Sequence, residues 1–545
     1  MSWQRLGRRP GGTVAALAVA DGGLLVATLA GVFARGRDGW LPLGPAPLTT
    51  AVSADGSLVL AADSRGIHVS RDAGHSWRLA LQSSAATAVV AAGPVLLAAS
   101  AEDGVQRSQD AGESWATANA GLLDLEVLAL AASPRCAENG FALAGTASGL
   151  FLSRNAGRSW RSVDLDPDET VVQALAISPF PDSAATALAG TTAHGLFMTR
   201  DAGASWMPLS GIEGSVSAVA IGDGGMAAAA AGTVWLSKDG GSWRTTADPG
   251  APVLALAYTA SGLVAGLAGL GIAVLDADGV TWRPDPSLAA SLTTRLRWSG
   301  GWTLALGPDG AIGVSEDAGR SWSTHATANA GTARDLVRWP ADGPIWLLAE
   351  TGLMRSIDRG RGWEQRGTGG SALASSTALW SAGTNGSLRS TADGLTWIEH
   401  PACPGGTIEH LAMAPDESPL AATADGLWLL EGSLWEQVLD GPVSLVASGR
   451  SHHLAAVGTT VLIGRHDEEG WQVAELGHGI GSIRALLAEP IVVGTAIGAV
   501  RSPDQGRRFL APDADGPPSV MALAALPGGE ILAADATGTL WRWRQ

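Results

Sequence analysis

The sequence predicts an all-β protein in which fourteen four-stranded blades form two seven-bladed β-propellers. Three observations support this prediction. An aromatic residue recurs every 34 to 46 residues through the 545-residue chain, a glycine turn precedes most copies, and short Ala/Val/Leu runs separate them. Repeats of this length are typical of propeller blades. Single rings usually hold about four to eight blades, so fourteen repeats favour two rings.

The recurring aromatic closes an eight-residue motif whose best copies begin at Ser70, Ser108, Ser153, Thr199 and Ser315, as in S-Q-D-A-G-E-S-W. The copies at Ser356 and Ser502 are less regular. The fourteen aromatic positions are Trp3, Trp40, Trp77, Trp115, Trp160, Trp206, Trp243, Trp282, Trp322, Trp363, Trp397, Trp435, Trp471 and Phe509. In a well-kept repeat, strands are expected at 127–132, 141–145 and 149–153, and a fourth begins at Trp160.

The motif's acidic position is expected to be structural. Ser, Thr and Asp side chains can hydrogen-bond the backbone of a tight turn, and glycine supplies the positive φ that the turn needs. The aromatic then fixes the next strand in the apolar layer. We therefore assign turn stabilisation, not catalysis, to Asp72, Asp110, Asn155, Asp201, Asp317, Asp358 and Asp504.

The two chain ends complement each other. Residues 538–544 read as a third strand with no fourth strand after it, and residues 2–6 resemble the missing one. We expect the N- and C-termini to share one blade, because pairing would leave no open strand edge.

Two domain boundaries are compatible with the repeats. The connectors richest in Pro, Gly and Asp, residues 245–253 and 510–520, lie seven repeats apart. They favour a first propeller built from residues 1–249 and 511–545, with residues 250–510 inserted as the second. The alternative cuts after the seventh repeat, giving 11–288 as one propeller and 289–545 plus 1–10 as the other.

The octet resembles the BNR or Asp-box repeat family, which includes sialidases, sortilin-type receptors and xyloglucanases. Sialidase activity would need a tyrosine nucleophile, but Tyr258 is the single tyrosine and lies within an apolar strand pattern. The resemblance to family-74 xyloglucanases implies paired carboxylates in a cleft between two propellers. Acidic residues that could form such a pair, a cation site or simply a solvated acidic rim are Asp124, Glu126, Asp164, Asp166, Asp168, Glu169 and Glu213.

Composition argues against several function classes. The net charge of −17 opposes nucleic-acid binding, since that requires clustered cations. No apolar run is long enough for membrane insertion. The only cysteines, Cys136 and Cys403, form no metal-binding motif, and no nucleotide-binding loop occurs. We therefore expect no metal and no cofactor. The apolar stretch 13–20 reads as a strand rather than an export signal, which favours a cytoplasmic location.

One sector departs from the repeat average. Trp and Arg dominate binding hot spots, and both gather on the eighth to tenth repeats. Arg295 and Arg297 alternate with apolar residues on an innermost strand, so they could meet an anionic ligand at a channel mouth. The candidate binding residues are Arg295, Arg297, Trp298, Trp302, Arg334, Arg338, Trp339, Trp346 and Trp380.

The sequence thus favours a non-enzymatic binding scaffold with a protein partner. The alternative is a carbohydrate-active protein, a xyloglucanase-like hydrolase or a lectin, whose partner is a glycan in the cleft between the propellers.

Overall fold

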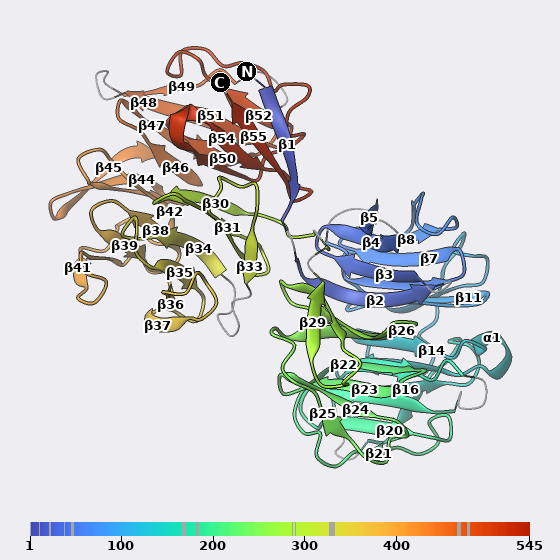
Figure 1. Cartoon of the computed structure of the whole chain (residues 1–545). Helices are drawn as coiled ribbons and strands as arrows, with labels where there is room; N and C mark the ends of the chain where they lie inside the picture. The colour runs from blue at the N-terminus through green and yellow to red at the C-terminus, as the bar shows by residue number, and fades with distance from the viewer. Residues whose placement is uncertain are drawn as a thin grey trace. The chain divides into compact units, whose positions relative to one another are not determined.

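A computed structural model describes residues 2–9, 11–20, 23–36, 39–44, 48–165, 170–180, 185–285, 287–288, 290–325, 333–465, 470–476 and 480–544. These residues form thirteen four-stranded antiparallel sheets and one three-stranded sheet. The chain divides into two compact units, residues 10–290 and residues 1–9 with 291–545. Each unit holds seven sheets, and we call the two units the N-terminal and the C-terminal propeller (Figure 1).

In the N-terminal propeller each blade runs outward in sequence order, as in β14 (Val127–Ala132), β15 (Ala142–Thr146), β16 (Gly149–Ser153) and β17 (Arg161–Val163). A short helix, α1 (Cys136–Asn139), lies in the link between β14 and β15. The innermost strands of the other six blades are β2 (Val14–Ala20), β6 (Ala51–Asp55), β10 (Ala86–Ala92), β18 (Val172–Ile177), β22 (Val216–Gly222) and β26 (Val253–Thr259).

In the C-terminal propeller the shared blade predicted from the two chain ends is confirmed. Strand β1 (Ser2–Arg8) pairs antiparallel with β55 (Thr539–Arg544), and Figure 1 shows the two strands side by side. The sheet continues through β54 (Ile531–Ala534) to β53 (Ala522–Ala525). The innermost strands of the other six blades are β30 (Arg295–Ser299), β34 (Ala333–Arg338), β38 (Ala372–Ser375), β42 (Ile408–Met413), β46 (Leu445–Ser448) and β50 (Ile483–Leu487).

The expected insertion of residues 250–510 into a first propeller is wrong, and the observed division lies beside the alternative boundary. The ring of the N-terminal propeller closes between its first and seventh blades. Val14 packs in one buried cluster with Val264 and Leu288, and the Gly11 N–H donates to the Leu288 carbonyl at 2.8 Å. The connector 245–253 therefore joins two blades of one ring. Pro and Gly make a turn sharp, but packing between blades decides where a domain ends.

One blade lacks its fourth strand among the described residues. Beyond β50, β51 (Val492–Thr495) and β52 (Gly498–Arg501), a single bridge joins Arg501 to Leu510. The segment that follows contains Pro512, Pro517 and Pro518. Proline has no N–H to give to a strand ladder, so pairing stops there.

The Asp-box turns have the geometry that the motif predicts. In the Ser108 copy, the Ser108 hydroxyl donates to Asp110 Oδ1 at 2.7 Å, and the Ser114 N–H donates to the same oxygen at 2.9 Å. Gly112 has φ +82°, and a Cβ there would lie 2.8 Å from Val69 of the neighbouring blade. In another copy Asn155 accepts the same two hydrogen bonds through its amide oxygen. The turn therefore needs an acceptor oxygen and not a charge.

Replacing Asp110 by Ala is expected to lower Tm by a few degrees, because Ser108 and Ser114 lose their acceptor. Asp110→Asn, which copies the Asn155 turn, should largely preserve the neutral-pH Tm.

The Ser114 hydroxyl and N–H hold the pKa of Asp110 below its usual range. Its contribution is therefore present above the unfolded-state value, about pH 4, and is lost as pH falls through the folded value. Thermal melts from neutral to acid pH should show a shallower acid loss for Asp110→Asn, and equal Tm for Asp110→Ala and wild type would contradict the role.

A charged central channel in the C-terminal propeller

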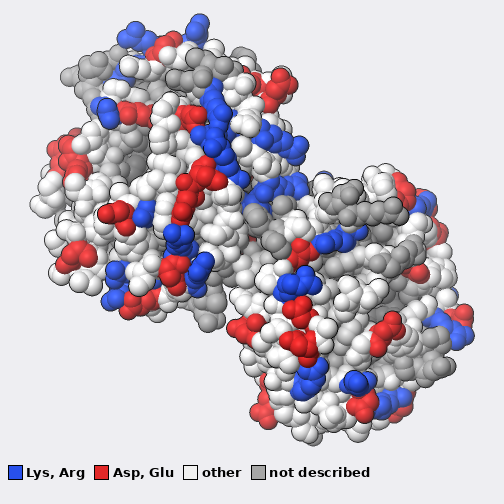
Figure 2. All heavy atoms as spheres, viewed as in Figure 1, with Lys and Arg blue, Asp and Glu red and all other residues white. Residues whose placement is uncertain are grey.

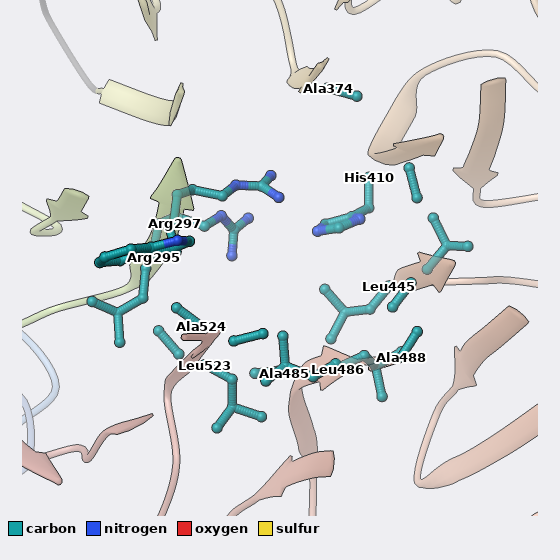
Figure 3. Close-up of a pocket in the computed structure, with 18 of the residues that line it drawn as sticks. Arg295, Arg297, Ala374, His410, Leu445, Ala485, Leu486, Ala488, Leu523 and Ala524 are labelled. Carbon is teal, nitrogen blue, oxygen red and sulfur yellow. The ribbon is translucent and has the colours of Figure 1, made fainter. Parts of the chain in front are cut away.

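The innermost strands of the C-terminal propeller surround a cavity of about 420 Å³. Arg295, Arg297 and Trp298 line it from β30, and His410 lines it from β42. Figure 3 shows the guanidinium groups of Arg295 and Arg297 and the imidazole of His410 pointing toward one another across this space. The remaining wall is mixed: it includes Leu445, Leu486 and Leu523, and also polar residues such as Thr294, Ser375 and Ser448.

Strand register shows how this channel departs from the repeat. In most blades the innermost strand carries a bulge. The residue directly after the bulge has the same pairing position in each of these blades, so these residues lie at one level of the ring. Blades without the bulge have an equivalent residue at the same pairing position. In the N-terminal propeller all seven of these residues are alanine: Ala16, Ala51, Ala88, Ala129, Ala174, Ala218 and Ala255.

The same level of the C-terminal propeller is not uniform. Its seven residues are Arg295, Asp335, Ala372, His410, Leu445, Ala485 and Ala522. Four of the seven blades thus depart from alanine, and three of those carry a titratable side chain. Alanine at this level is sufficient to build a ring, as the N-terminal propeller demonstrates. The Arg, Asp and His side chains therefore need a cause beyond construction of the fold.

Asp335 lies behind the channel wall and pairs with one of its arginines. Arg297 Nη2 lies 3.1 Å from Asp335 Oδ2, and the side chains are 33% and 6% exposed, respectively. The backbone N–H groups of Leu336 and Leu373 donate to the two carboxylate oxygens at 2.9 and 3.2 Å. Burial alone would raise the pKa of Asp335, but Arg297 and then Arg295 outweigh it and hold that pKa below its usual range. The carboxylate is charged, and its contacts link the blades that begin with β30, β34 and β38.

His410 is electrically neutral at physiological pH. Burial first, and then the positive charges of Arg297 and Arg295, lower the pKa of its imidazole to about 3. The negative charge of Asp335, and then the Val446 backbone, act in the opposite direction. Nδ1 is buried and has no hydrogen-bond partner among the described residues.

Positive charge exceeds negative charge on the channel wall. Arg484, on β50, is the third arginine that lines the cavity, and its guanidinium donates to Ser482 and lies near Met521. Glu489 lines the rim but contacts Arg450, through the backbone N–H and the side chain. The Nε of Arg295 is buried without a partner in the part of the chain that the structure describes. Because the Asp335 carboxylate already pairs with Arg297, the remaining positive charge of the wall can neutralise the charge of a bound anion.

The structure divides the nine residues that the sequence proposed for binding. Arg295, Arg297 and Trp298 come together at the channel. Arg334 is exposed at the bulge of β34 and does not line the cavity.

The other five residues of that prediction pack between strands and blades. Arg338 is buried, donates to the Gly343 and Gly300 carbonyls, and lies 3.8 Å from the Trp302 ring centroid. Trp339 and Trp346 are buried, and Trp346 Nε1 donates to the Trp339 carbonyl at 3.0 Å. For Arg338, Trp339 and Trp346 the expectation of a recognition surface is therefore wrong. Trp380 is half-buried, with its ring centroid 4.6 Å from that of His400.

The acidic residues of the N-terminal propeller show individual roles. Asp124 accepts hydrogen bonds from the backbone N–H groups of Glu126 and Ser148, so it stabilises a turn. Glu126, Asp164 and Glu213 are exposed. Asp166, Asp168 and Glu169 lie outside the described residues.

Asp335, His410 and Arg484 were not predicted as site residues. A signal for two of them exists in the repeats themselves. The innermost strands V-A-A-L-A, V-L-A-L-A and V-Q-A-L-A, from Val14, Val127 and Val172, share an alanine that becomes histidine in I-E-H-L-A from Ile408 and aspartate in A-R-D-L-V from Ala333. Arg484 instead occupies the bulge position itself. Comparing equivalent strands, rather than composition, would have found all three.

Cysteine, metal and membrane sites are three further kinds of functional site that a chain can carry. Cys136 and Cys403 are buried and unpaired. Within the described ranges, no three His, Cys, Asp or Glu side chains are grouped so that they could hold a metal, and no helix is long and apolar enough to cross a membrane. On the face shown in Figure 2, acidic and basic side chains lie side by side on both units, so the net charge of −17 is dispersed there.

Comparison with known proteins supports the fold. No protein-family model and no curated protein matches the chain. Among solved structures, a GH74 enzyme from Niastella koreensis is similar with a TM-score of 0.68 and 13% identity over 99% of each chain. The GH74 xyloglucanase from Xanthomonas campestris has a TM-score of 0.58 and 15% identity over 100% of each chain. PorZ, a surface component of the type-IX secretion system of Porphyromonas gingivalis, has a TM-score of 0.55 and 12% identity over 99% of this chain and 86% of its own. The chain therefore has the double-propeller fold of the GH74 enzymes.

Proposed function

We propose that the chain is a ligand-binding protein that takes a small organic anion into the central channel of its C-terminal propeller. The observation that carries the proposal is the replacement of ring alanines by Arg295, Asp335 and His410 around a cavity of about 420 Å³. Pockets with apolar walls and a few convergent polar groups are typical of small-molecule sites.

The charge distribution favours an anion over a neutral ligand or a cation. Three arginines line the cavity, while the buried carboxylate of Asp335 is occupied by Arg297 and two backbone N–H groups. Arginine presents planar N–H donors that match a carboxylate. An unpaired cationic group in a partly desolvated site also gains most from an anionic partner.

A carbohydrate-active protein is the second candidate function, and the GH74 likeness over the full length favours it. We also infer from the octets that the chain is related to the Asp-box repeat family. A purified chain that releases reducing ends from xyloglucan would establish this candidate. A protein partner and a cytoplasmic location stay predictions.

Phenylacetate, a carboxylate with an apolar ring, is the first probe of the anion proposal. Isothermal titration of the full chain should show binding that weakens as salt increases, because the attraction is partly electrostatic. Arg295→Met should weaken it about tenfold, the value of one charge-assisted contact. We replace Arg295 rather than Arg297 because Asp335 then keeps its ion-pair partner, Arg297.

Arg161→Met is the matched control, since Arg161 is exposed on β17 of the N-terminal propeller. It should bind phenylacetate like the wild type. The proposal fails if phenylacetate binds no better than neutral 2-phenylethanol, or if Arg295→Met and Arg161→Met behave alike.

A further inference from the structure

We infer that the ligand of this channel carries two carboxylate groups, one held by Arg295 and Arg297 and the other by Arg484. The inference rests on the proposed anion site and adds the second anionic group of the ligand. It follows from the charge of the channel wall and from the place of Arg484 in its strand.

The channel wall carries two positive charges that no carboxylate of the described residues balances. Three arginines line the cavity: Arg295, Arg297 and Arg484. Asp335 pairs with Arg297, and Glu489 at the rim contacts Arg450. The other two lining arginines have no carboxylate within ion-pair distance in the part of the chain that the structure describes. A ligand with one negative charge balances one of them, and a ligand with two balances both.

Arg484 stands at the β-bulge of its strand, and bulge side chains in this protein reach the next blade. In the N-terminal propeller the Thr87 hydroxyl donates to the Val127 carbonyl at 2.6 Å. The Ser217 hydroxyl donates to the Val253 carbonyl, also at 2.6 Å. In six innermost strands of that propeller the bulge residue is uncharged: Ala15, Thr87, Leu128, Gln173, Ser217 and Leu254. Contact between neighbouring blades therefore needs no charge at this position, and the guanidinium of Arg484 needs another cause.

The guanidinium of Arg484 reaches the start of β53, the innermost strand of the next blade. Its Nη1 lies 3.1 Å from Sδ of Met521, the residue directly before β53, and Met521 also lines the cavity. Nε donates to the Ser482 hydroxyl at 3.2 Å. A guanidinium has five N–H donors, and a thioether sulfur is only a weak acceptor. Arg484 therefore keeps donors for an anionic ligand at the channel wall.

Strand β53 lies between the two unbalanced cationic groups. It packs against β30 on one side and against β50 on the other. Figure 3 shows Ala524 of β53 between Arg295 and Ala485 of β50. Ala522 and Ala524 line the cavity, and their small side chains leave space beside the strand. A ligand that lies along β53 can place one carboxylate at Arg295 and the other at Arg484.

Carboxyphenylacetates test the second carboxylate, since each is phenylacetate with one more carboxylate on its ring. The ortho, meta and para isomers have the same size and charge and differ in the separation of their carboxylates. Isothermal titration of the full chain should show that the best isomer binds about tenfold more tightly than phenylacetate, the effect of one charge-assisted hydrogen bond. The matching carbamoylphenylacetate, in which an uncharged amide replaces the ring carboxylate, should bind like phenylacetate.

Arg484→Met identifies the residue responsible. This variant should abolish the preference for the best isomer over phenylacetate, while Arg484→Lys, which keeps the charge, should retain part of it. Arg334→Met is the matched control, because Arg334 is the bulge residue of β34 but is exposed and does not line the cavity. It should keep the full preference. A preference that survives Arg484→Met, or that falls equally in Arg334→Met, would overturn the inference.

Phenyl phosphate separates two carboxylates from one doubly charged group. Its phosphate carries two negative charges above about pH 6. If phenyl phosphate binds more tightly than every carboxyphenylacetate at about pH 8, the two charges belong to one group and the dicarboxylate inference is wrong.

The same titrations separate this inference from the anion site on which it rests. If every carboxyphenylacetate binds only as tightly as phenylacetate, the second carboxylate is wrong and the anion site stands. If neither phenylacetate nor any of the isomers binds, both proposals fail.

Discussion

Replacing Asp335 by Ala is expected to destabilise the C-terminal propeller by about 3 to 5 kcal/mol, the usual cost of breaking a buried ion pair from one side. Arg297 would lose its carboxylate partner, and the N–H groups of Leu336 and Leu373 would lose their acceptor. Each unsatisfied buried donor costs about 1 to 3 kcal/mol, while the one-third exposure of Arg297 reduces its share. Denaturant unfolding followed by fluorescence measures the loss.

The double variant Arg297→Ala/Asp335→Ala is the matched control. It removes both charges together, so it should be less destabilised than Asp335→Ala alone. Alanine itself is compatible with this register, because seven blades of the N-terminal propeller carry it there. If the two residues are not coupled, the second mutation will add its own full loss of stability. The double variant would then be less stable than Asp335→Ala.

Local features of the fold could be predicted from the sequence because their causes are local. The contacts of Ser108, Asp110 and Ser114 lie within seven consecutive residues, and similar residue types recreate them in other copies. The count of blades follows from that recurrence. The shared blade was also predictable, since a strand missing at one end of the chain is visible at the other.

Features that depend on contacts between distant strands could not be predicted in the same way. Trp346 and Trp339 looked exceptional by composition, but their burial depends on neighbours in adjacent strands and the next blade. The ring closure through Val14 and Leu288 joins residues about half the chain apart, which connector composition does not report. His410 became meaningful only when strand pairing placed it at the level of Arg295 and Asp335.

Deleting residues 2–6 is expected to have the largest effect of any change considered, about 5 kcal/mol or more from the C-terminal propeller. Trp3 is 9% exposed and packs against Val492, Val520 and Trp543. Truncating a buried Trp alone usually costs about 3 to 5 kcal/mol. The deletion also removes most of the pairing partner of β55 and leaves an open strand edge.

Unfolding and light scattering of the truncated chain should therefore show an early transition together with self-association. Because each propeller has its own core, the transition of the N-terminal propeller serves as an internal reference and should not move. Trp3→Ala should reproduce much of the loss, while Gln4→Ala, exposed on the same strand, should not. A peptide with the sequence of residues 2–8, added in trans, should raise the stability of the truncated chain by mass action, since it binds the folded ring and not the unfolded chain. Unchanged stability and no self-association after the deletion would mean that β1 does not close this ring.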